Sequence, residues 1–389
     1  MTRRLRVLFL FEGLYGRGAE RVSLGLISRL DREAFEPSIW ILRGGEDALR
    51  AEVPEGVPVT VVLGEGQRIR HALTRVPATL LRQARGADVI VGTVELMPTY
   101  FAGLAGLLTG RPAVGWVRNS LDHTYAEQPA WHRLLSRVVY ARLPRLVCVS
   151  RGTRDTLARL QRLRDEQFRV VYNPVDLARI GEWQAGPLPE WAQGMTRRPT
   201  VLGAGRLTAQ KGFDTLIRAH ALLRERGVDH DLLIVGEGEL RGELESLIRE
   251  LGVSGSVHLP GHVPNPYPLM RHAAAFALSS RWEGFGNVVV EALACGVPVV
   301  STDCPSGPAE ILEGGRHGLL VPTDDAGALA SALGTVLGDS ALAARLRENG
   351  PRRARDFAPE VTVPQWEGVL REVAAGRAAA DRTTAGAGT

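Results

Sequence analysis

The chain has 389 residues, of which 44% are hydrophobic and 23% are charged. This composition excludes a fibrous or intrinsically disordered protein, and the length predicts two domains, because a single core rarely grows beyond about 250–300 residues. Residues 1–175 carry 26 arginines against 17 acids, net +9, whereas residues 176–389 are net −5, so the first half favours an anionic partner: a membrane surface, a lipid-linked phosphate or a nucleic acid.

Signals for export, membrane insertion and structural metal are weak. The apolar run at residues 7–11 follows three arginines but stops at Glu12, which is too short for a secretion signal, and no apolar stretch approaches the ~18 residues of a membrane span. The three cysteines are isolated, which fits a reducing compartment and argues against structural zinc. We expect a cytoplasmic protein, at most peripheral on the inner face of the plasma membrane.

Short apolar runs alternate with amphipathic segments along the chain. Strands that are apolar on both faces and separated by helices predict parallel sheets covered on both sides. In the first half we expect strands at residues 6–11, 57–63, 88–91, 113–117, 146–149 and 169–171, and helices at 20–30, 69–84, 100–108, 131–141 and 153–163. In the second half we expect strands at 201–204, 232–235, 256–259, 275–278 and 297–301, and helices at 213–226, 240–251, 268–272 and 287–295.

This alternation predicts an α/β protein with two doubly wound, Rossmann-like domains in tandem, whose parallel sheets face a central cleft. We expect a first domain over residues 1–175, a linker over 176–198 and a second domain over 199–358. A helix over 359–375 would return to the first domain, and the Ala-, Gly- and Thr-rich tail, 376–389, would be disordered.

Lys211 is the only lysine, and arginine supplies the other 46 basic residues. It shares with Arg206 a stretch that follows an apolar run and precedes a helical pattern. Phosphate sites often combine a compact ammonium with a planar guanidinium, so this stretch predicts a diphosphate clamp. The alternative is that arginine-rich codon usage left one lysine at random on a solvated turn.

A second polar element follows the expected strand end at Ser279. The turn glycines at 284–286 let the backbone approach a ligand, and the helix that starts near Asn287 offers free N–H groups to a phosphate. Glu283 in the turn and Glu291 in the helix could each accept hydrogen bonds from a vicinal diol. Alternatively, the first is a capping residue and the second a partly exposed helix position.

This Glu-x7-Glu element resembles that of the retaining glycosyltransferases of family 4, which have the two-domain GT-B fold. The resemblance implies that Glu283 holds the donor sugar and Glu291 the nucleotide ribose, and that Arg206 and Lys211 bind the diphosphate. Arg206, Lys211 and Glu283 are then the candidate catalytic residues. The other implied donor-binding positions in this half are His262, Val263, Gly284, Phe285, Gly286, Asn287 and Glu310.

In the first half, the stretch 17–22 resembles the family's glycine-rich turn over the donor phosphates, which adds Gly16 and Gly18 to the candidate donor contacts. The family often has two consecutive glycines where this chain has Arg17 followed by Gly18. The family histidine that often follows the strand equivalent to 113–117 is also absent. Acceptor-side candidates for its place are Arg118, Asn119 and His123.

Two stretches resemble metal- and dinucleotide-binding motifs, but their context argues against both kinds of site. The triplet 229–231 has the DxD form of metal-dependent sugar transferases, but it directly precedes a strand and indicates a surface turn, so we expect no metal. The turn at 236–238 lacks the third glycine of a dinucleotide fingerprint, where Arg241 stands, which disfavours NAD. We expect no cofactor beyond a nucleotide diphosphate sugar as co-substrate, a UDP-sugar by default.

Together these features predict a retaining glycosyltransferase that works in polysaccharide or lipid-linked glycan synthesis, without nucleic acid as a partner. The alternatives are a nucleotide-sugar epimerase of similar architecture and a non-catalytic nucleotide-sugar binding protein. A basic, aromatic segment could rest on an anionic membrane, or it could be a helix packed on its own sheet. It contains Tyr125, Trp131, Leu134 and Leu135 interleaved with Arg133, Arg137, Arg142 and Arg145.

Overall fold

A computed structural model describes residues 3–16, 18–45, 49–67, 70, 72, 74–126 and 128–386. The chain forms two compact units. The N-terminal unit contains the residues up to Pro174 together with those from Pro359 onward, and the C-terminal unit is Val175–Ala358.

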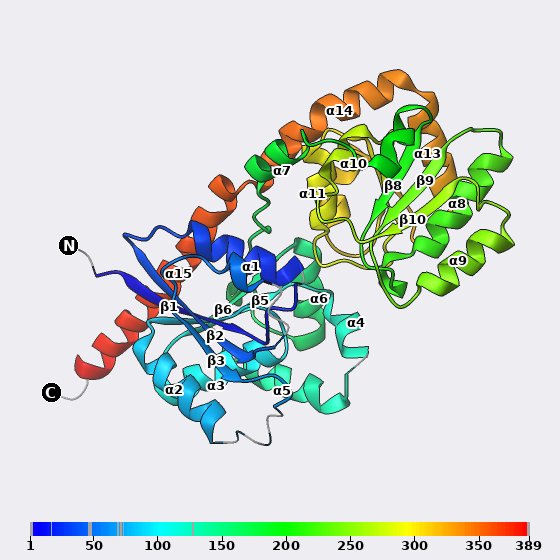
Figure 1. Cartoon of the computed structure of the whole chain (residues 1–389). Coiled ribbons are helices and arrows are strands. Elements are labelled where there is room, and N and C mark those ends of the chain that lie inside the picture. Colours follow the sequence, from blue (N-terminus) through cyan, green and yellow to red (C-terminus); the bar gives the residue numbers. More distant parts are fainter. Residues whose placement is uncertain are drawn as a thin grey trace. The chain divides into compact units, whose positions relative to one another are not determined.

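The N-terminal unit has a seven-stranded parallel sheet of order β3-β2-β1-β4-β5-β6-β7. Its strands are almost entirely buried because helices cover both faces. Helices α1 and α15 lie on one face, and α2, α3 and α5 lie on the other (Figure 1). The strands are β1 (Leu5–Phe11), β2 (Phe35–Arg43), β3 (Val59–Leu63), β4 (Val89–Gly92), β5 (Ala113–Val117), β6 (Arg145–Cys148) and β7 (Phe168–Val170); the helices are α1 (Gly18–Arg29), α2 (Arg75–Gly86), α3 (Met97–Thr109), α4 (Leu121–Ala126), α5 (Ala130–Tyr140), α6 (Arg151–Gln161) and α15 (Pro359–Gly386).

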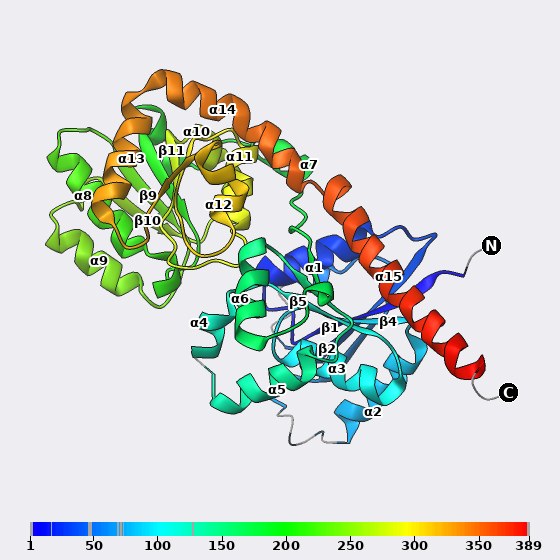
Figure 2. The ribbon, with the colours of Figure 1, turned by 180° about the vertical axis from the view of Figure 1, so that it is seen from behind.

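The C-terminal unit has a six-stranded parallel sheet of order β10-β9-β8-β11-β12-β13. Helices α8, α9 and α13 cover one face, and α10 and α11 cover the other (Figure 2). The strands are β8 (Thr200–Ala204), β9 (Asp231–Val235), β10 (Val257–Gly261), β11 (Ala275–Leu278), β12 (Val299–Thr302) and β13 (Leu319–Val321); the helices are α7 (Leu177–Trp183), α8 (Phe213–Glu225), α9 (Arg241–Glu250), α10 (Tyr267–His272), α11 (Asn287–Ala294), α12 (Pro308–Ile311), α13 (Ala326–Gly338) and α14 (Ser340–Ala354).

The expected α/β class with two Rossmann-like sheets is confirmed, but several elements differ from the sequence analysis. No strand was expected where β2 lies, although an apolar run, residues 39–42, follows Glu36 and Pro37 there. The stretch 176–198, expected as a linker, contains α7 and a 3-10 helix over Glu190–Thr196, and both belong to the C-terminal unit.

Helix α15 continues to Gly386, through most of the tail for which the composition predicted disorder. The tail is rich in alanine, which has the highest helix propensity of all residues. In the N-terminal unit this helix packs its Trp366 against Trp116, with ring centroids 4.3 Å apart. Its Glu367 carboxylate also accepts a hydrogen bond of 2.9 Å from the backbone N–H of Asp31.

Within the described residues, no one helix has both the length and the apolar composition to span a bilayer. Two consecutive helical segments, Ala326–Gly338 and Ser340–Gly376, meet the length and composition criteria only when they are counted as one helix, and they are bent by 93° where they meet.

Candidate functional site

The C-terminal unit has its topological switch point between β8 and β11, the central strands from which the chain winds in opposite directions. Ligands of open α/β sheets bind at the carboxyl ends of the strands at such a point, where the loops after the two strands separate. The loop after β8 carries Arg206 and Lys211, and the loop after β11 carries Glu283. The fold therefore brings together two stretches that are about seventy residues apart in the sequence.

Lys211 and Glu283 form an ion pair at this point. The Lys211 Nζ donates to Glu283 Oε1 at 2.6 Å, and the Ser280 hydroxyl donates to the same oxygen at 2.7 Å. The Lys211 side chain is 16% exposed and the Glu283 side chain 9%. The lysine stem passes over Gly205, where a Cβ would come within 3.3 Å of Lys211 Cε. The ammonium is thus fixed by one carboxylate, and within the described part of the chain its other N–H groups make no further hydrogen bond and can serve a bound acceptor.

Hydrogen bonds between the two loops hold this geometry. The Gln210 side chain donates to the Trp282 carbonyl at 2.9 Å, and the Arg281 backbone N–H donates to the Gln210 carbonyl at 2.8 Å. Gly212 has φ 59°, and a Cβ there would lie 2.2 Å from the Ser279 carbonyl oxygen. Only glycine allows that close approach of the loops.

Arg206 is exposed on the same loop, and its side chain makes no hydrogen bond or ion pair with the residues that the structure describes. This exposed guanidinium, on the same loop as the ammonium of the buried ion pair, leaves positive charge facing solvent. This arrangement suits an anion, and whether the two cations share one diphosphate stays a prediction.

The turn before α11 is buried and tightly packed. Phe285 packs edge-on against Phe357 at 5.5 Å between ring centroids. Gly307 has φ 94°, and a Cβ there would lie 1.9 Å from the Phe285 carbonyl oxygen, so the loop before α12 closes onto this turn. Gly286 caps α11 with φ 93° and with no side-chain hydrogen bond to the first-turn N–H groups. These backbone groups and the dipole favour a negatively charged ligand here.

The remaining candidates of this half lie around the same end of the sheet. Glu310 is on α12, next to the turn, and Glu291 is half-buried on α11. The Gly236 N–H donates to the Gly261 carbonyl at 2.9 Å, which places exposed His262 and half-buried Val263 just beyond the end of β10. Their roles toward a sugar or base stay predictions.

In the N-terminal unit the switch point lies between β1 and β4. A cavity of about 550 Å³ opens there, which we call the switch-point pocket. Its lining includes three carboxylates, Glu12, Glu20 and Glu95, and the half-exposed aromatic Trp131. Such a pocket suits a polar ring with hydroxyl groups.

The three acceptor-side candidates have different places. Asn119 lines the switch-point pocket, and its amide donates to Glu95 Oε1. Arg118 is 6% exposed and belongs to the interior, and His123 is half-buried on α4 and does not line the pocket. Of the three, the structure therefore brings only Asn119 to the cavity.

Arg118 is held by partners on every side. Its Nε donates to the Thr93 carbonyl at 3.0 Å and its Nη2 to the Ser23 hydroxyl at 2.9 Å, and the guanidinium lies 3.5 Å from the Trp116 ring centroid. Burial lowers the pKa of Arg118 to about 9 and the nearby Glu95 opposes this shift, so the group stays charged at neutral pH. The guanidinium of Arg118 therefore holds the loop after β4, through Thr93, against Ser23 of α1.

Sequence analysis missed Glu95, Ser280 and His132 as site residues. Glu95 follows β4 by three residues, and a search for acids just after apolar strands could have found it. His132 is buried in α5, lines the switch-point pocket, and its Nδ1 makes no hydrogen bond with the described residues. No local pattern marks this histidine.

The glycine-rich turn after β1 is only partly described, because Arg17 lies outside the described residues. Gly16 has φ 89°, a conformation that favours glycine, whereas Gly18 begins α1 with open space around its Cβ position.

The DxD triplet is used in packing. Arg198 pairs with Asp229 at 3.3 Å and with Asp231 at 3.0 Å, while the buried His230 ring contacts the His220 ring at 2.8 Å between nitrogens. No group of three or more potential metal ligands occurs among the residues that the structure describes. Metal independence stays a prediction.

The buried His220 predicts acid sensitivity of the C-terminal unit. Burial lowers the pKa of His220 to about 3, against ~6.5 in an unfolded chain. Between these values the unfolded state binds a proton that the folded state refuses, so stability falls as pH drops from about 6.5 toward 3, by up to ~1.4 kcal/mol per pH unit. Urea unfolding at several pH values measures this slope, which should flatten in His220→Gln. An equal slope in the variant would contradict it.

Two doubly wound parallel sheets with polar loops at their switch points fit the GT-B fold, and comparison with known proteins shows this class. Residues 16–179 match the family described as "Glycosyltransferase Family 4", and residues 192–353 match "Glycosyl transferases group 1". One relative is the N-acetylgalactosamine-N,N'-diacetylbacillosaminyl-diphospho-undecaprenol 4-alpha-N-acetylgalactosaminyltransferase of Campylobacter jejuni. The two chains are 31% identical over 267 residues, and this match covers 68% of this chain and 69% of that protein. The chain belongs to glycosyltransferase family 4 and is a glycosyltransferase.

Two further likenesses are more partial or more distant. The chain is 37% identical over 172 residues to the GDP-mannose-dependent alpha-(1-6)-phosphatidylinositol monomannoside mannosyltransferase of Mycolicibacterium smegmatis, covering 42% of this chain and 45% of that protein. It thus spans about half the length of that relative. Among solved structures, Anabaena Alr3699/HepE in complex with UDP superposes with a TM-score of 0.82 at 22% identity, over 95% of this chain and all of that chain. This likeness supports the fold.

Proposed function

We propose that this glycosyltransferase moves a sugar from a nucleotide diphosphate sugar to a hydroxyl of a lipid-linked or polysaccharide acceptor, with retention of anomeric configuration. The observation that carries the donor part is the fixed Lys211–Glu283 pair at the switch point of the C-terminal unit, with unpaired Arg206 on the same loop. A UDP-sugar is the default donor, since a similar fold was solved with UDP.

The chemistry follows from where charge develops. As the sugar leaves, negative charge builds on the diphosphate, so fixed cations and the α11 N-terminus stabilise the transition state more than the ground state. No carboxylate stands out as a covalent nucleophile. We therefore favour a front-face displacement in which the departing phosphate oxygen accepts the proton of the acceptor hydroxyl.

The acceptor part rests on the relatives. The Campylobacter jejuni enzyme is named for a diphospho-undecaprenol acceptor and the Mycolicibacterium smegmatis enzyme for a phosphatidylinositol mannoside. The positive charge of the first half of the chain fits an acceptor that carries phosphate. Peripheral attachment to an anionic membrane would suit such an acceptor.

A thermal-shift panel of UDP-, GDP- and ADP-sugars tests donor choice, because bound ligand raises apparent stability by mass action. We expect one nucleotide class to raise the melting temperature, with the shift unchanged by EDTA. The preferred donor is then incubated with and without a polyprenyl diphosphate glycan acceptor. Sugar transfer only with acceptor supports the proposal, isomerised donor without acceptor would support the epimerase, and binding without product would support a non-catalytic binding protein.

A further inference from the structure

Helix α5 has its polar face turned inward and its apolar face turned outward. Its buried residues are His132, Ser136 and Tyr140, and Gln161 donates to the Ser136 hydroxyl at 3.0 Å from the interior. An amphipathic helix of a globular protein normally buries its apolar face. The exposed face of α5 instead carries Trp131, Leu134, Leu135 and Val138, which are 36–65% exposed.

The neighbouring helix α3 extends this apolar surface. Leu104, Leu107 and Leu108 are 48%, 68% and 58% exposed. We call these residues and the exposed face of α5 the α3–α5 face. The sequence analysis left two interpretations open for the basic, aromatic segment that contains α5: a membrane contact, or a helix packed on its own sheet. Packing inside the N-terminal unit accounts for the polar side of α5 but not for its exposed apolar side.

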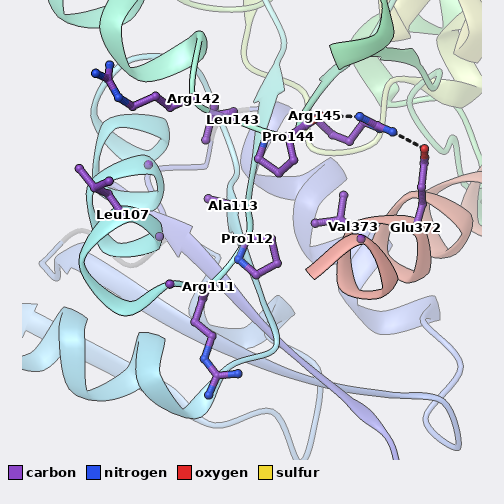
Figure 3. Close-up of a pocket in the computed structure, with 14 residues that line it drawn as sticks. Leu107, Arg111, Pro112, Ala113, Arg142, Leu143, Pro144, Arg145, Glu372 and Val373 are labelled. Carbon is purple, nitrogen blue, oxygen red and sulfur yellow. Dashed lines mark hydrogen bonds and ion pairs between the residues drawn. The ribbon is translucent and has the colours of Figure 1, made fainter. Parts of the chain in front are cut away.

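A groove of about 500 Å³ runs between the two helices, with an almost wholly apolar lining that includes Phe101, Leu104 and Val138. One end shares Met97 and Trp131 with the switch-point pocket. The other end shares Gly103, Leu107 and Arg142 with a second cavity of about 480 Å³ (Figure 3). The groove therefore adjoins the switch-point pocket, with Met97 and Trp131 at their common border.

The segments that carry the α3–α5 face are basic, whereas the acids of the two adjoining cavities, among them Glu95 and Glu372, lie beyond the ends of the groove. Residues 96–121 and 128–154 contain no acidic residue. Arg133 and Arg142 donate only to the backbone carbonyls of Tyr125 and Val138, and Arg137 has no side-chain partner among the described residues. In the second cavity, by contrast, Figure 3 shows Arg145 turned toward its ion-pair partner Glu372. Within the described ranges, Arg133, Arg137 and Arg142 thus have no carboxylate partner beside this apolar surface.

We propose that the α3–α5 face docks on an anionic lipid bilayer and that the groove admits the lipid part of the acceptor to the switch-point pocket. An apolar stripe ringed by unpaired arginines is what a helix needs to lie in the headgroup region of an anionic membrane. The second statement rests on the proposed lipid-linked acceptor, whereas the first is independent of it.

Vesicle co-sedimentation tests the docking. The full chain should bind phosphatidylcholine vesicles that contain phosphatidylglycerol and bind pure phosphatidylcholine vesicles more weakly. The chain should be released from the anionic vesicles as the salt concentration rises from about 0.1 M to about 1 M, because the Debye length falls from ~10 Å to ~3 Å. Leu108→Asp with Leu134→Asp should lower vesicle affinity by roughly tenfold or more, since charges are expelled from the acyl boundary. The control is Val361→Asp, at an exposed apolar residue of α15.

Arg137→Glu tests the charge component against Arg218→Glu on α8, which is also exposed. Only the first should weaken binding to anionic vesicles. If UDP raises the melting temperature of each variant as much as it does for the unaltered chain, the C-terminal unit of that variant is intact.

Absence of vesicle binding by the unaltered chain would overturn the docking proposal, even if glycosyl transfer is observed. Light scattering that shows a dimer, which the leucine variants convert to a monomer, would make this face an interface between copies instead. Docking with no transfer to any lipid-linked acceptor would retain the bilayer contact and reject the proposed acceptor.

Discussion

Lys211→Ala is expected to lower turnover by on the order of 10² or more, with a smaller effect on donor affinity, as removal of a preorganised charge stabiliser commonly does. The ammonium is already in place without a donor, because the Glu283 carboxylate holds it at 2.6 Å and the lysine stem is packed over Gly205. Little reorganisation is then needed as charge develops on the leaving diphosphate. Steady-state kinetics with the preferred donor give turnover, and calorimetry gives the dissociation constant of the nucleotide.

The ion pair complicates a single substitution, because Lys211→Ala also leaves the mostly buried Glu283 without its cation. Breaking a buried pair in this way can itself destabilise a protein by ~3–5 kcal/mol. Lys211→Ala combined with Glu283→Gln removes both charges and restores neutrality. If the unpaired acid causes the loss of stability, the double variant recovers the melting temperature. Because Glu283 is itself a candidate catalytic residue, turnover of the double variant is compared with that of Glu283→Gln alone: equal turnover would show that the missing cation has no effect of its own, and lower turnover would show that it has.

Arg218→Ala is the matched control, since it removes an exposed cation from α8 of the same unit. Lys211→Arg should restore turnover only in part, because a guanidinium is planar and cannot replace the compact ammonium over Gly205. Near-normal turnover in Lys211→Ala would count decisively against the diphosphate clamp.

The sheets could be predicted from the sequence largely because their strands are apolar on both faces. The exception is β2, whose Pro37 pairs with Val7 of β1 but lies before the pairing with β3, which begins at Ile39, so the proline stands at the singly paired start of the strand. Helix α5 shows the limit of periodicity: its pattern fixed a helix, but could not say that the apolar side faces outward.

Candidate donor residues could be predicted as motifs that follow strands. What the sequence did not contain was that β8 and β11 are neighbours, since strand order depends on contacts far along the chain. The same limit explains Ser280, whose hydrogen bond to Glu283 depends on the folded turn. Arg118 could not be distinguished from Asn119 because adjacent residues at a strand end point in different directions.

Arg118→Met is expected to destabilise the N-terminal unit by ~3–5 kcal/mol, because it leaves the acceptors of the buried guanidinium without their donor, at a cost of ~1–3 kcal/mol for each unsatisfied group. The guanidinium joins the end of β4, through the Thr93 carbonyl, to Ser23 of α1, and approaches Asn173 at 3.4 Å. At ~2–4 °C per kcal/mol for a unit of this size, the melting temperature should fall by roughly 10 °C. Scanning calorimetry measures the shift.

The neighbouring Asn119 provides the control for a role in acceptor binding. It is exposed and lines the switch-point pocket, so Asn119→Ala should leave the melting temperature nearly unchanged and raise the KM for acceptor. Arg118→Lys should recover part of the stability, since it keeps the charge but loses the planar fork of donors. A positioning residue acts through the stability of the loops that it joins. If Arg118→Met kept the normal melting temperature but lost turnover, the guanidinium would instead act directly on the acceptor.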